Sequence, residues 1–117
     1  MESQVLLRKD QREKLQQRLG VSFERIAEFC QFYLIKELAV FGSILREDFK
    51  AESDIDFLVS VLPEVSISLN YLESLETELK QMVSREVDLI FKENLARSEN
   101  WIRKKAILSS AEVIYES

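Results

Sequence analysis

The 117-residue sequence contains no histidine, and it has only one cysteine, two glycines and one proline. Without histidine, it lacks the usual general base of enzymes and the usual protein ligand of transition metals. Any metal chemistry must therefore depend on carboxylates and on a hard ion such as Mg²⁺. The single cysteine, Cys30, excludes an internal disulfide and favours a reducing compartment. We expect Cys30 to be a small core residue, because nothing near it in the sequence would activate its thiol.

Long hydrophobic runs are also missing. No stretch approaches the roughly 20 apolar residues of a membrane-spanning helix, and the start, MESQVLLRKDQREKL, lacks the apolar core of a signal peptide. The 16 lysines and arginines are outnumbered by 21 aspartates and glutamates, which gives a net charge of −5. A chain with this charge has no overall basic field to attract nucleic acid. We therefore expect a cytoplasmic protein with no membrane partner and no direct nucleic-acid partner.

The hydrophobic pattern predicts a single α+β domain with a small mixed β-sheet flanked by helices. A chain of this length builds one core and is too short for two. The predicted order is a helix over 3–19, a helix after Ser22, a strand over 38–41, a strand over 55–61, a helix over 68–83, a strand over 86–91 and a last helix from Asn94 or Ser98. The final segment, AEVIY, forms either a short edge strand or an extended arm.

Gly20 marks the expected end of the first helix, since glycine commonly follows the last turn of a helix. We therefore divide the chain into an N-terminal helical extension, residues 1–20, and the functional domain, residues 21–117. The apolar side chains over 5–19 lie in a polar background. This helix either packs on its own domain or mediates self-association, and the sequence leaves both open, so a homo-oligomer remains one of two outcomes.

Two aspartates interrupt the second predicted strand, in the stretch VFGSILREDFKAESDIDFLV. Asp54 and Asp56 point to the same face, roughly 7 Å apart, because strand side chains alternate. Like charges this close raise each other's pKa unless a cation lies between them. Asp88 interrupts VDLI in the same way and joins this site if the two strands are neighbours. Carboxylates that converge from two strands, together with substrate phosphates, suit two Mg²⁺ ions and phosphoryl or nucleotidyl transfer. The alternative is that Asp54 is an ordinary turn residue.

Gly42 and Ser43 follow the first predicted strand. Glycine lets the backbone approach a ligand closely, and backbone N–H groups at the start of a helical turn favour phosphate. The Ser43 hydroxyl can add a hydrogen bond to a phosphate oxygen, and Arg46 can bring its planar guanidinium to the same phosphates. A Gly-Ser pair is often only a turn, and Arg46 is equally explained as a surface residue. The downstream aspartates favour the phosphate interpretation.

The stretch GSILREDFKAESDID resembles the signature of the DNA polymerase β-type nucleotidyltransferase superfamily, in which Gly-Ser is followed after ten residues by Asp-x-Asp. More narrowly, residues 22–115 resemble the minimal nucleotidyltransferase family, whose members are antitoxins of HEPN-domain ribonuclease toxins. The resemblance implies a nucleotidyltransferase domain in which Gly42 and Ser43 bind the nucleoside triphosphate. It further implies that Asp54 and Asp56 bind the metal ions. Asp88 would complete this catalytic site and help to deprotonate the attacking hydroxyl.

The resemblance also implies a donor and a partner. The donor would be ATP, and AMP would be transferred to a tyrosine of the cognate HEPN toxin, which silences that toxin. One alternative is a non-catalytic antitoxin that neutralises its toxin by binding and occlusion. Transfer to a small molecule such as an aminoglycoside is a weaker alternative, because no second domain remains to hold the acceptor.

The aromatic and basic residues near the end of the chain have two interpretations each. We expect Trp101 and Tyr115 to be packing residues, with a partner contact as the alternative. The basic run over 97–105 is more typical of a solvated helix face than of a binding patch.

Overall fold

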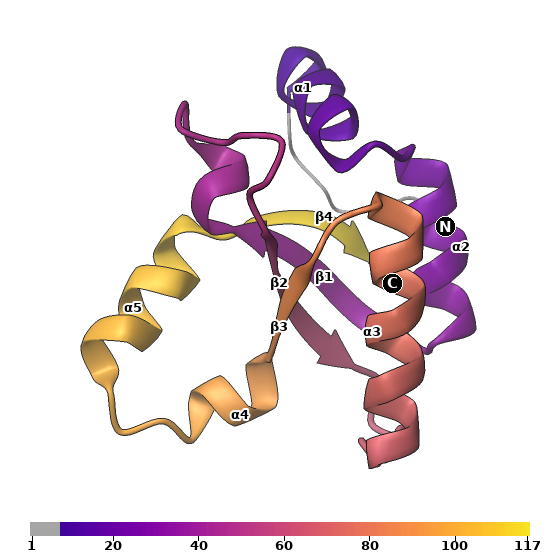
Figure 1. Cartoon of the computed structure of the whole chain (residues 1–117). Helices are drawn as coiled ribbons and strands as arrows, with labels where there is room; N and C mark the ends of the chain where they lie inside the picture. Colours follow the sequence, from indigo (N-terminus) through magenta and orange to yellow (C-terminus); the bar gives the residue numbers. More distant parts are fainter. Residues whose placement is uncertain (1–7) are drawn as a thin grey trace.

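The computed structural model describes residues 8–117, and a four-stranded sheet lies at their centre (Figure 1). The sheet order is β3-β2-β1-β4. Strand β1 pairs antiparallel with both β2 and β4, whereas β2 and β3 are parallel. The strand bounds are Ile35–Phe41 for β1, Ile55–Val61 for β2, Val87–Phe91 for β3 and Glu112–Glu116 for β4. The predicted α+β class with a small mixed sheet is confirmed.

Helices cover the two faces of the sheet unequally (Figure 1). On one face, α2 and α3 pack on the sheet, and the leucines of α1 join the same main core. On the other face, the short α4 and α5 cover a second, smaller cluster around Ala39 and Leu58. The helix bounds are Lys9–Leu19 for α1, Phe23–Phe32 for α2, Leu69–Val83 for α3, Lys92–Ala96 for α4 and Trp101–Ser110 for α5. One sheet face is therefore thickly covered and the other only in part.

Local signals in the sequence explain most helix ends. The Ser22 hydroxyl accepts a hydrogen bond from the Arg25 backbone N–H at 3.1 Å, and this caps α2 as predicted. Ser68 caps α3 in the same way. Gly20 ends α1 in the left-handed conformation, with a φ of 73°. The last long helix begins later than predicted, because Asn100 provides its cap.

The strands also differ from the prediction at their ends. Strand β1 begins at Ile35 rather than at residue 38, so it also contains the charged residues Lys36 and Glu37. Glu37 lies in the strand through its pairing with Ser60 of β2 and Glu116 of β4, and its carboxylate pairs with the ammonium group of Lys92 at 2.9 Å. The terminal AEVIY segment forms an edge strand that pairs with β1, which confirms the edge strand and not the extended arm.

Side-chain burial tests three further predictions. Cys30 is fully buried, and its burial raises the pKa of the thiol well above the usual range. Tyr115 is a core residue, as predicted. Trp101 is 68% exposed, so the prediction that it packs in the core is wrong. It occupies the first turn of α5, which buries only Ile107.

The N-terminal helix α1 packs on its own domain. Leu15 and Leu19 are buried in the main cluster together with Ile26 and Phe23 of α2. No helix over residues 8–117 has the length and apolar character needed to cross a membrane.

Candidate active site

Strand pairing brings the predicted carboxylates to one end of the sheet. Asp54 directly precedes β2, and Asp56 is the second residue of that strand. Asp56 and Asp88 are direct partners in the parallel pairing of β2 with β3. Neighbouring strands lie about 4.8 Å apart, so side chains of paired residues on one face are close neighbours. The prediction that the strand of Asp88 lies beside that of Asp56 is confirmed.

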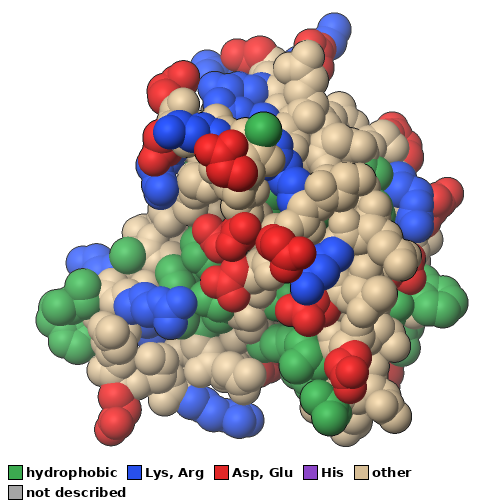
Figure 2. Space-filling view, viewed as in Figure 1, with side chains coloured by type: hydrophobic (Ala, Val, Ile, Leu, Met, Phe, Trp, Pro, Cys, Tyr) green, Lys and Arg blue, Asp and Glu red, His purple; other side chains and the backbone are tan. Residues whose placement is uncertain are grey.

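The three aspartates lie on the sheet face that is only partly covered. Ile55, Phe57 and Val59 are buried in the main core on the opposite face. Because strand side chains alternate, Asp56 shares its face with Leu58, which belongs to the smaller cluster. Figure 2 shows acidic side chains gathered near the middle of one view of the molecule, with lysine and arginine side chains above and beside them.

Asp56 has a perturbed carboxyl group. It is half-buried, whereas Asp54 and Asp88 are exposed. Burial raises the pKa of Asp56 above its ordinary value, and the negative charges of Asp88 and Asp54 raise this pKa further. The positive charge of Arg46 acts in the opposite direction and lowers it. A cation bound between these carboxylates would relieve the same repulsion.

Gly42 lies directly against the Asp56 carboxylate. Gly42 has a φ of 79°, in the left-handed region that disfavours other residues. A Cβ atom at this position would collide with Oδ2 of Asp56. The missing side chain thus allows the turn after β1 and the carboxylate of β2 to approach each other. The two halves of the predicted motif, Gly-Ser and Asp-x-Asp, are neighbours in the structure.

Ser43 and Arg46 lie in the short turn that follows. The 3-10 helix η1, Gly42–Leu45, contains Ser43, whose carbonyl accepts a hydrogen bond from the Arg46 backbone N–H at 2.9 Å. The Arg46 guanidinium is exposed and forms an ion pair with Asp48 at 3.1 Å. Its charge nevertheless acts on Asp56. Arg46 is thus near the carboxylates, and its role with phosphate stays a prediction.

The donor set fits Mg²⁺ when a nucleotide supplies the remaining ligands. Within residues 8–117, no group of three or more histidine, cysteine, aspartate and glutamate side chains forms a ready-made metal site. Mg²⁺ binds commonly through one or two carboxylates plus substrate phosphates, and it keeps several waters. Asp56 with Asp54 or Asp88 provides such carboxylates, and the Gly42 backbone lies beside them. That all three aspartates hold two ions stays a prediction.

Two arginines near the site lie outside the sequence motif, and the sequence analysis did not identify them. Arg18 of α1 and Arg85, which follows α3, donate hydrogen bonds to the loop that joins the Gly-Ser turn to Asp54. Their sequence separation from this loop exceeds 25 residues. No periodicity or short spacing could have identified them, since the contacts exist only in the folded chain.

The comparison with protein families agrees with this geometry. Residues 24–114 match the family model described as nucleotidyltransferase domain. The chain belongs to the nucleotidyltransferase domain family. The matched range begins in α2, ends within β4, and includes β1, β2 and β3 as well as Gly42, Asp54, Asp56 and Asp88.

Two curated relatives of this nucleotidyltransferase domain are archaeal. A Methanocaldococcus jannaschii protein, classed by name with the protein adenylyltransferases, is 40% identical over 63 residues. The match covers 54% of this chain and 62% of that relative's length. Protein adenylyltransferase MntA of Thermococcus cleftensis is 38% identical over 68 residues, which cover 58% of this chain and 67% of the relative.

Solved structures with the same nucleotidyltransferase fold include toxin–antitoxin complexes. A toxin–antitoxin structure with AMP-PNP has a TM-score of 0.62 and 17% identity, and the match covers 83% of this chain and 75% of that chain. A complex of a tri-AMPylated HEPN toxin with its MNT antitoxin, from Shewanella oneidensis, has a TM-score of 0.55 and 16% identity. That match covers 81% of this chain and 70% of the other. At these identities, the similarity concerns the fold.

Proposed function

We propose that this protein is a Mg²⁺-dependent nucleotidyltransferase antitoxin. It transfers AMP from ATP to a tyrosine of a cognate HEPN ribonuclease toxin and so neutralises the toxin. The observation that carries this proposal is the position of Asp56, which lies against Gly42 and is paired with Asp88 on the neighbouring strand. A phosphate cradle and a cation site thereby become a single site, as nucleotidyl transfer requires.

The relatives support the chemical class of donor and acceptor. Both curated relatives are named as protein adenylyltransferases. Among the solved structures, one toxin–antitoxin complex contains AMP-PNP and another contains a HEPN toxin that carries AMP. The site of the present chain lies open on a partly covered sheet face, so a protein acceptor can bring its own binding surface. A tyrosine hydroxyl stands far from its own backbone and can reach such a half-buried site.

The residues of the chain take separate roles in this reaction. The backbone at Gly42 and the Ser43 hydroxyl bind the triphosphate, and Arg46 adds charge beside it. Asp88, the exposed partner of Asp56 on the neighbouring strand, accepts the proton of the attacking tyrosine hydroxyl. The tyrosine oxygen forms a bond to the α-phosphorus, while the bond from that phosphorus to pyrophosphate breaks. When bound to Asp54 and Asp56, Mg²⁺ neutralises charge on the phosphates.

A transfer assay with ATP labelled at the α-phosphate tests the proposal. A HEPN-domain protein from the same genome is purified and incubated with the protein, Mg²⁺ and the labelled nucleotide. We expect the toxin to gain label, and mass spectrometry to locate AMP on a tyrosine. The Asp54→Ala/Asp56→Ala variant should give no label. Asp10→Ala, which removes an exposed carboxylate from α1, is the matched control and should retain the wild-type rate. Equal labelling by the double variant would refute the assignment of the carboxylates.

Neutralisation by occlusion is the second candidate, and an observation on the surface favours it. Large apolar side chains are exposed on the protein, among them Phe32 at 77%, Leu69 at 70% and Trp101 at 68%. Exposed apolar side chains mark a protein contact where they form one contiguous patch. In this case, the Asp54→Ala/Asp56→Ala variant would still protect cells that express the toxin. Loss of protection in that variant would favour catalysis.

A further inference from the structure

The loop between the Gly-Ser turn and Asp54 forms a connection between the two halves of the candidate site. Its residues, 44–53, are mostly exposed and contain no strand or long helix. Ordering a loop without such support costs conformational entropy at every residue. The contacts that hold this loop in one conformation therefore bear directly on the site.

Arg18 of α1 holds the end of the loop nearest to the phosphate cradle. Its Nη1 donates hydrogen bonds to the backbone carbonyl of Ile44 at 2.7 Å and to that of Arg46 at 2.6 Å. These two carbonyls belong to η1 and to the residue that ends it. The turn that begins at Gly42 and Ser43 is thus tied to the last turn of α1.

Arg85 holds the opposite end of the loop, next to the carboxylates. Its Nη1 lies 2.7 Å from the carbonyl oxygen of Lys50, 2.9 Å from that of Ala51 and 3.0 Å from that of Ser53. Ser53 immediately precedes Asp54. Arg85 itself follows Ser84, which ends α3 in the left-handed conformation, so the side chain extends from a fixed turn before β3.

The ring of Phe49 connects the two arginines. The Arg18 guanidinium carbon lies 5.2 Å from the centre of this ring, and that of Arg85 lies 4.3 Å from it. Both distances are typical of cation–π contacts. Phe49 also packs against the main core. The two guanidinium groups and the ring therefore form one anchor for the whole loop, which we call the arginine clamp: Arg18, Phe49 and Arg85.

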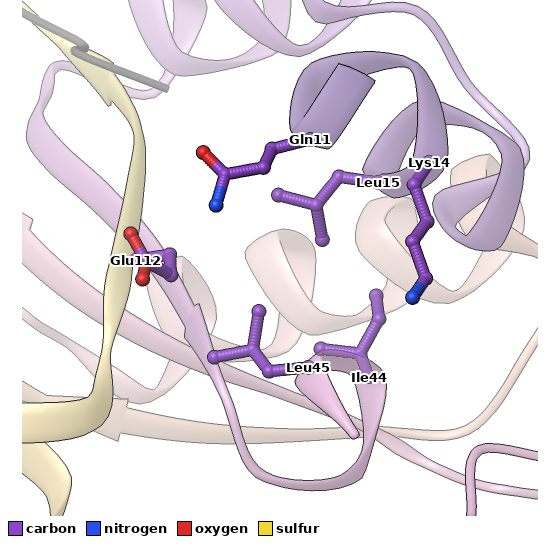
Figure 3. Close-up of a pocket in the computed structure, with 6 residues that line it drawn as sticks. All are labelled: Gln11, Lys14, Leu15, Ile44, Leu45 and Glu112. Carbon is purple, nitrogen blue, oxygen red and sulfur yellow. The ribbon is translucent and has the colours of Figure 1, made fainter. Parts of the chain in front are cut away.

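The side chains of α1 and of the turn at η1 do not fill the space between these two elements. Figure 3 shows a pocket between them, and its volume is about 180 Å³. It is lined by Gln11, Lys14, Leu15, Ile44, Leu45 and Glu112. The hydrogen bonds of Arg18 bridge the two elements beside this gap, and the exposed ion pair of Lys14 with Glu47 at 3.5 Å adds little.

We propose that Arg18 and Arg85 are positioning residues of the nucleotidyl transfer reaction, and that they act on its two halves separately. Arg18 sets the phosphate cradle at Gly42 and Ser43, whereas Arg85 sets Asp54 relative to Asp56. This inference rests on the proposed function, and it assigns α1 a part in the active site. Small displacements of reacting groups reduce rates by up to about 100-fold, even when the altered residue lies away from the chemistry.

The test compares Arg18→Gln and Arg85→Gln with Arg12→Gln as the matched control. Arg12 also lies on α1 and over an aromatic ring, that of Phe23 at 5.1 Å, so the control loses the same kind of contact away from the loop. Two quantities are measured on the full chain well below its unfolding temperature. The first is the Kd for AMP-PNP with Mg²⁺, and the second is kcat for AMP transfer to the toxin.

We expect a split between the two variants. Arg18→Gln should raise the Kd for AMP-PNP about tenfold, because charge-assisted hydrogen bonds of this kind are lost at the cradle. Arg85→Gln should leave this Kd within about twofold and lower kcat at least about tenfold. Arg12→Gln should change neither. Equal Kd and kcat for wild type, Arg18→Gln and Arg85→Gln would overturn the inference, whatever their unfolding temperatures.

Lysine variants cover the case in which a glutamine variant fails to fold. Lysine keeps the charge but lacks the planar guanidinium that lies over the Phe49 ring while its Nη1 bonds the carbonyls, so Arg18→Lys and Arg85→Lys should show the same split at smaller size. Folded lysine variants without a split would also overturn the inference. A wild-type protein that binds no AMP-PNP with Mg²⁺ would contradict the proposed function instead, so the two failures are distinguishable.

Discussion

At the scale of single residues, Asp56 is held in an environment that disfavours its charge. It is half-buried, and both Asp54 and Asp88 add negative charge, so its pKa is raised. A raised carboxyl pKa means that the folded state binds the proton more tightly than the unfolded state. Stability therefore falls as the pH rises from the ordinary value of 3.8 through the raised pKa. Such a loss of stability on ionisation is typical of a carboxylate in a functional site that binds a cation.

The variant Asp56→Asn should be more stable than the wild type in metal-free buffer at neutral pH. The asparagine carries no charge, so the repulsion and the associated fall in stability with rising pH both disappear. Urea unfolding with a chelator at several values between about pH 4 and pH 8 measures the difference. Asp10→Asn, which alters an exposed side chain of α1, is the control and should bring no such gain in stability. A less stable Asp56→Asn at neutral pH would contradict this explanation of the raised pKa.

Gly42 can be tested against Gly20, because both have a left-handed φ, 79° and 73°. An alanine at either position costs about 1–2 kcal/mol in backbone strain. Only at Gly42 would the added Cβ also collide with Asp56, while Gly20 has open space. We expect Gly42→Ala to lose stability beyond Gly20→Ala and, unlike it, to lose binding of AMP-PNP with Mg²⁺. Chemical unfolding and calorimetric titration provide the two measurements. Equal nucleotide binding by both variants would show that the close approach at Gly42 is dispensable.

At the scale of elements, α1 belongs to the structural core. Leu19 is fully buried in the main cluster, although it lies in the segment that the sequence suggested as an extension. Leu19→Ala should therefore lower the free energy of unfolding by about 2–5 kcal/mol. Leu69→Ala on the surface of α3 is the control, since Leu69 is 70% exposed, and should change it by less than about 0.5 kcal/mol. If chemical unfolding gave equal values for the two variants, α1 would not be part of the cooperative core.

Elements with local signals were predictable, and those set by distant contacts were not. The caps at Ser22 and Ser68 depend on residues within the same turn, and the sequence alone placed the cap at Ser22 and the start of the helix near Ser68. The start of β1 was missed because the charged residue Glu37 belongs to the sheet through pairing with β2 and β4, which are distant in the chain. Trp101 was taken for a core residue by its type, although the turn of α5 that carries it faces solvent.

At the scale of the whole molecule, the site depends on the order of the strands. The Gly-Ser to Asp-x-Asp spacing in the sequence predicted which residues meet. The spacing did not predict the strand pairing that brings them together. The parallel pairing of β2 with β3 follows from the passage of the chain through α3. That pairing sets Asp88 beside Asp56, and the antiparallel pairing of β1 with β2 brings Gly42 to the same end of the sheet. The arginine clamp likewise exists only in the complete fold.

The most direct test of the central claim is a crystal structure with AMP-PNP and Mn²⁺, whose anomalous scattering locates the metal. We predict a metal peak in contact with the carboxylate of Asp56 and with that of Asp54 or Asp88. The phosphates should share this metal and lie against the backbone of Gly42 and Ser43. Metal and phosphates bound at another surface, with the Asp56 carboxylate in contact with neither, would contradict the account.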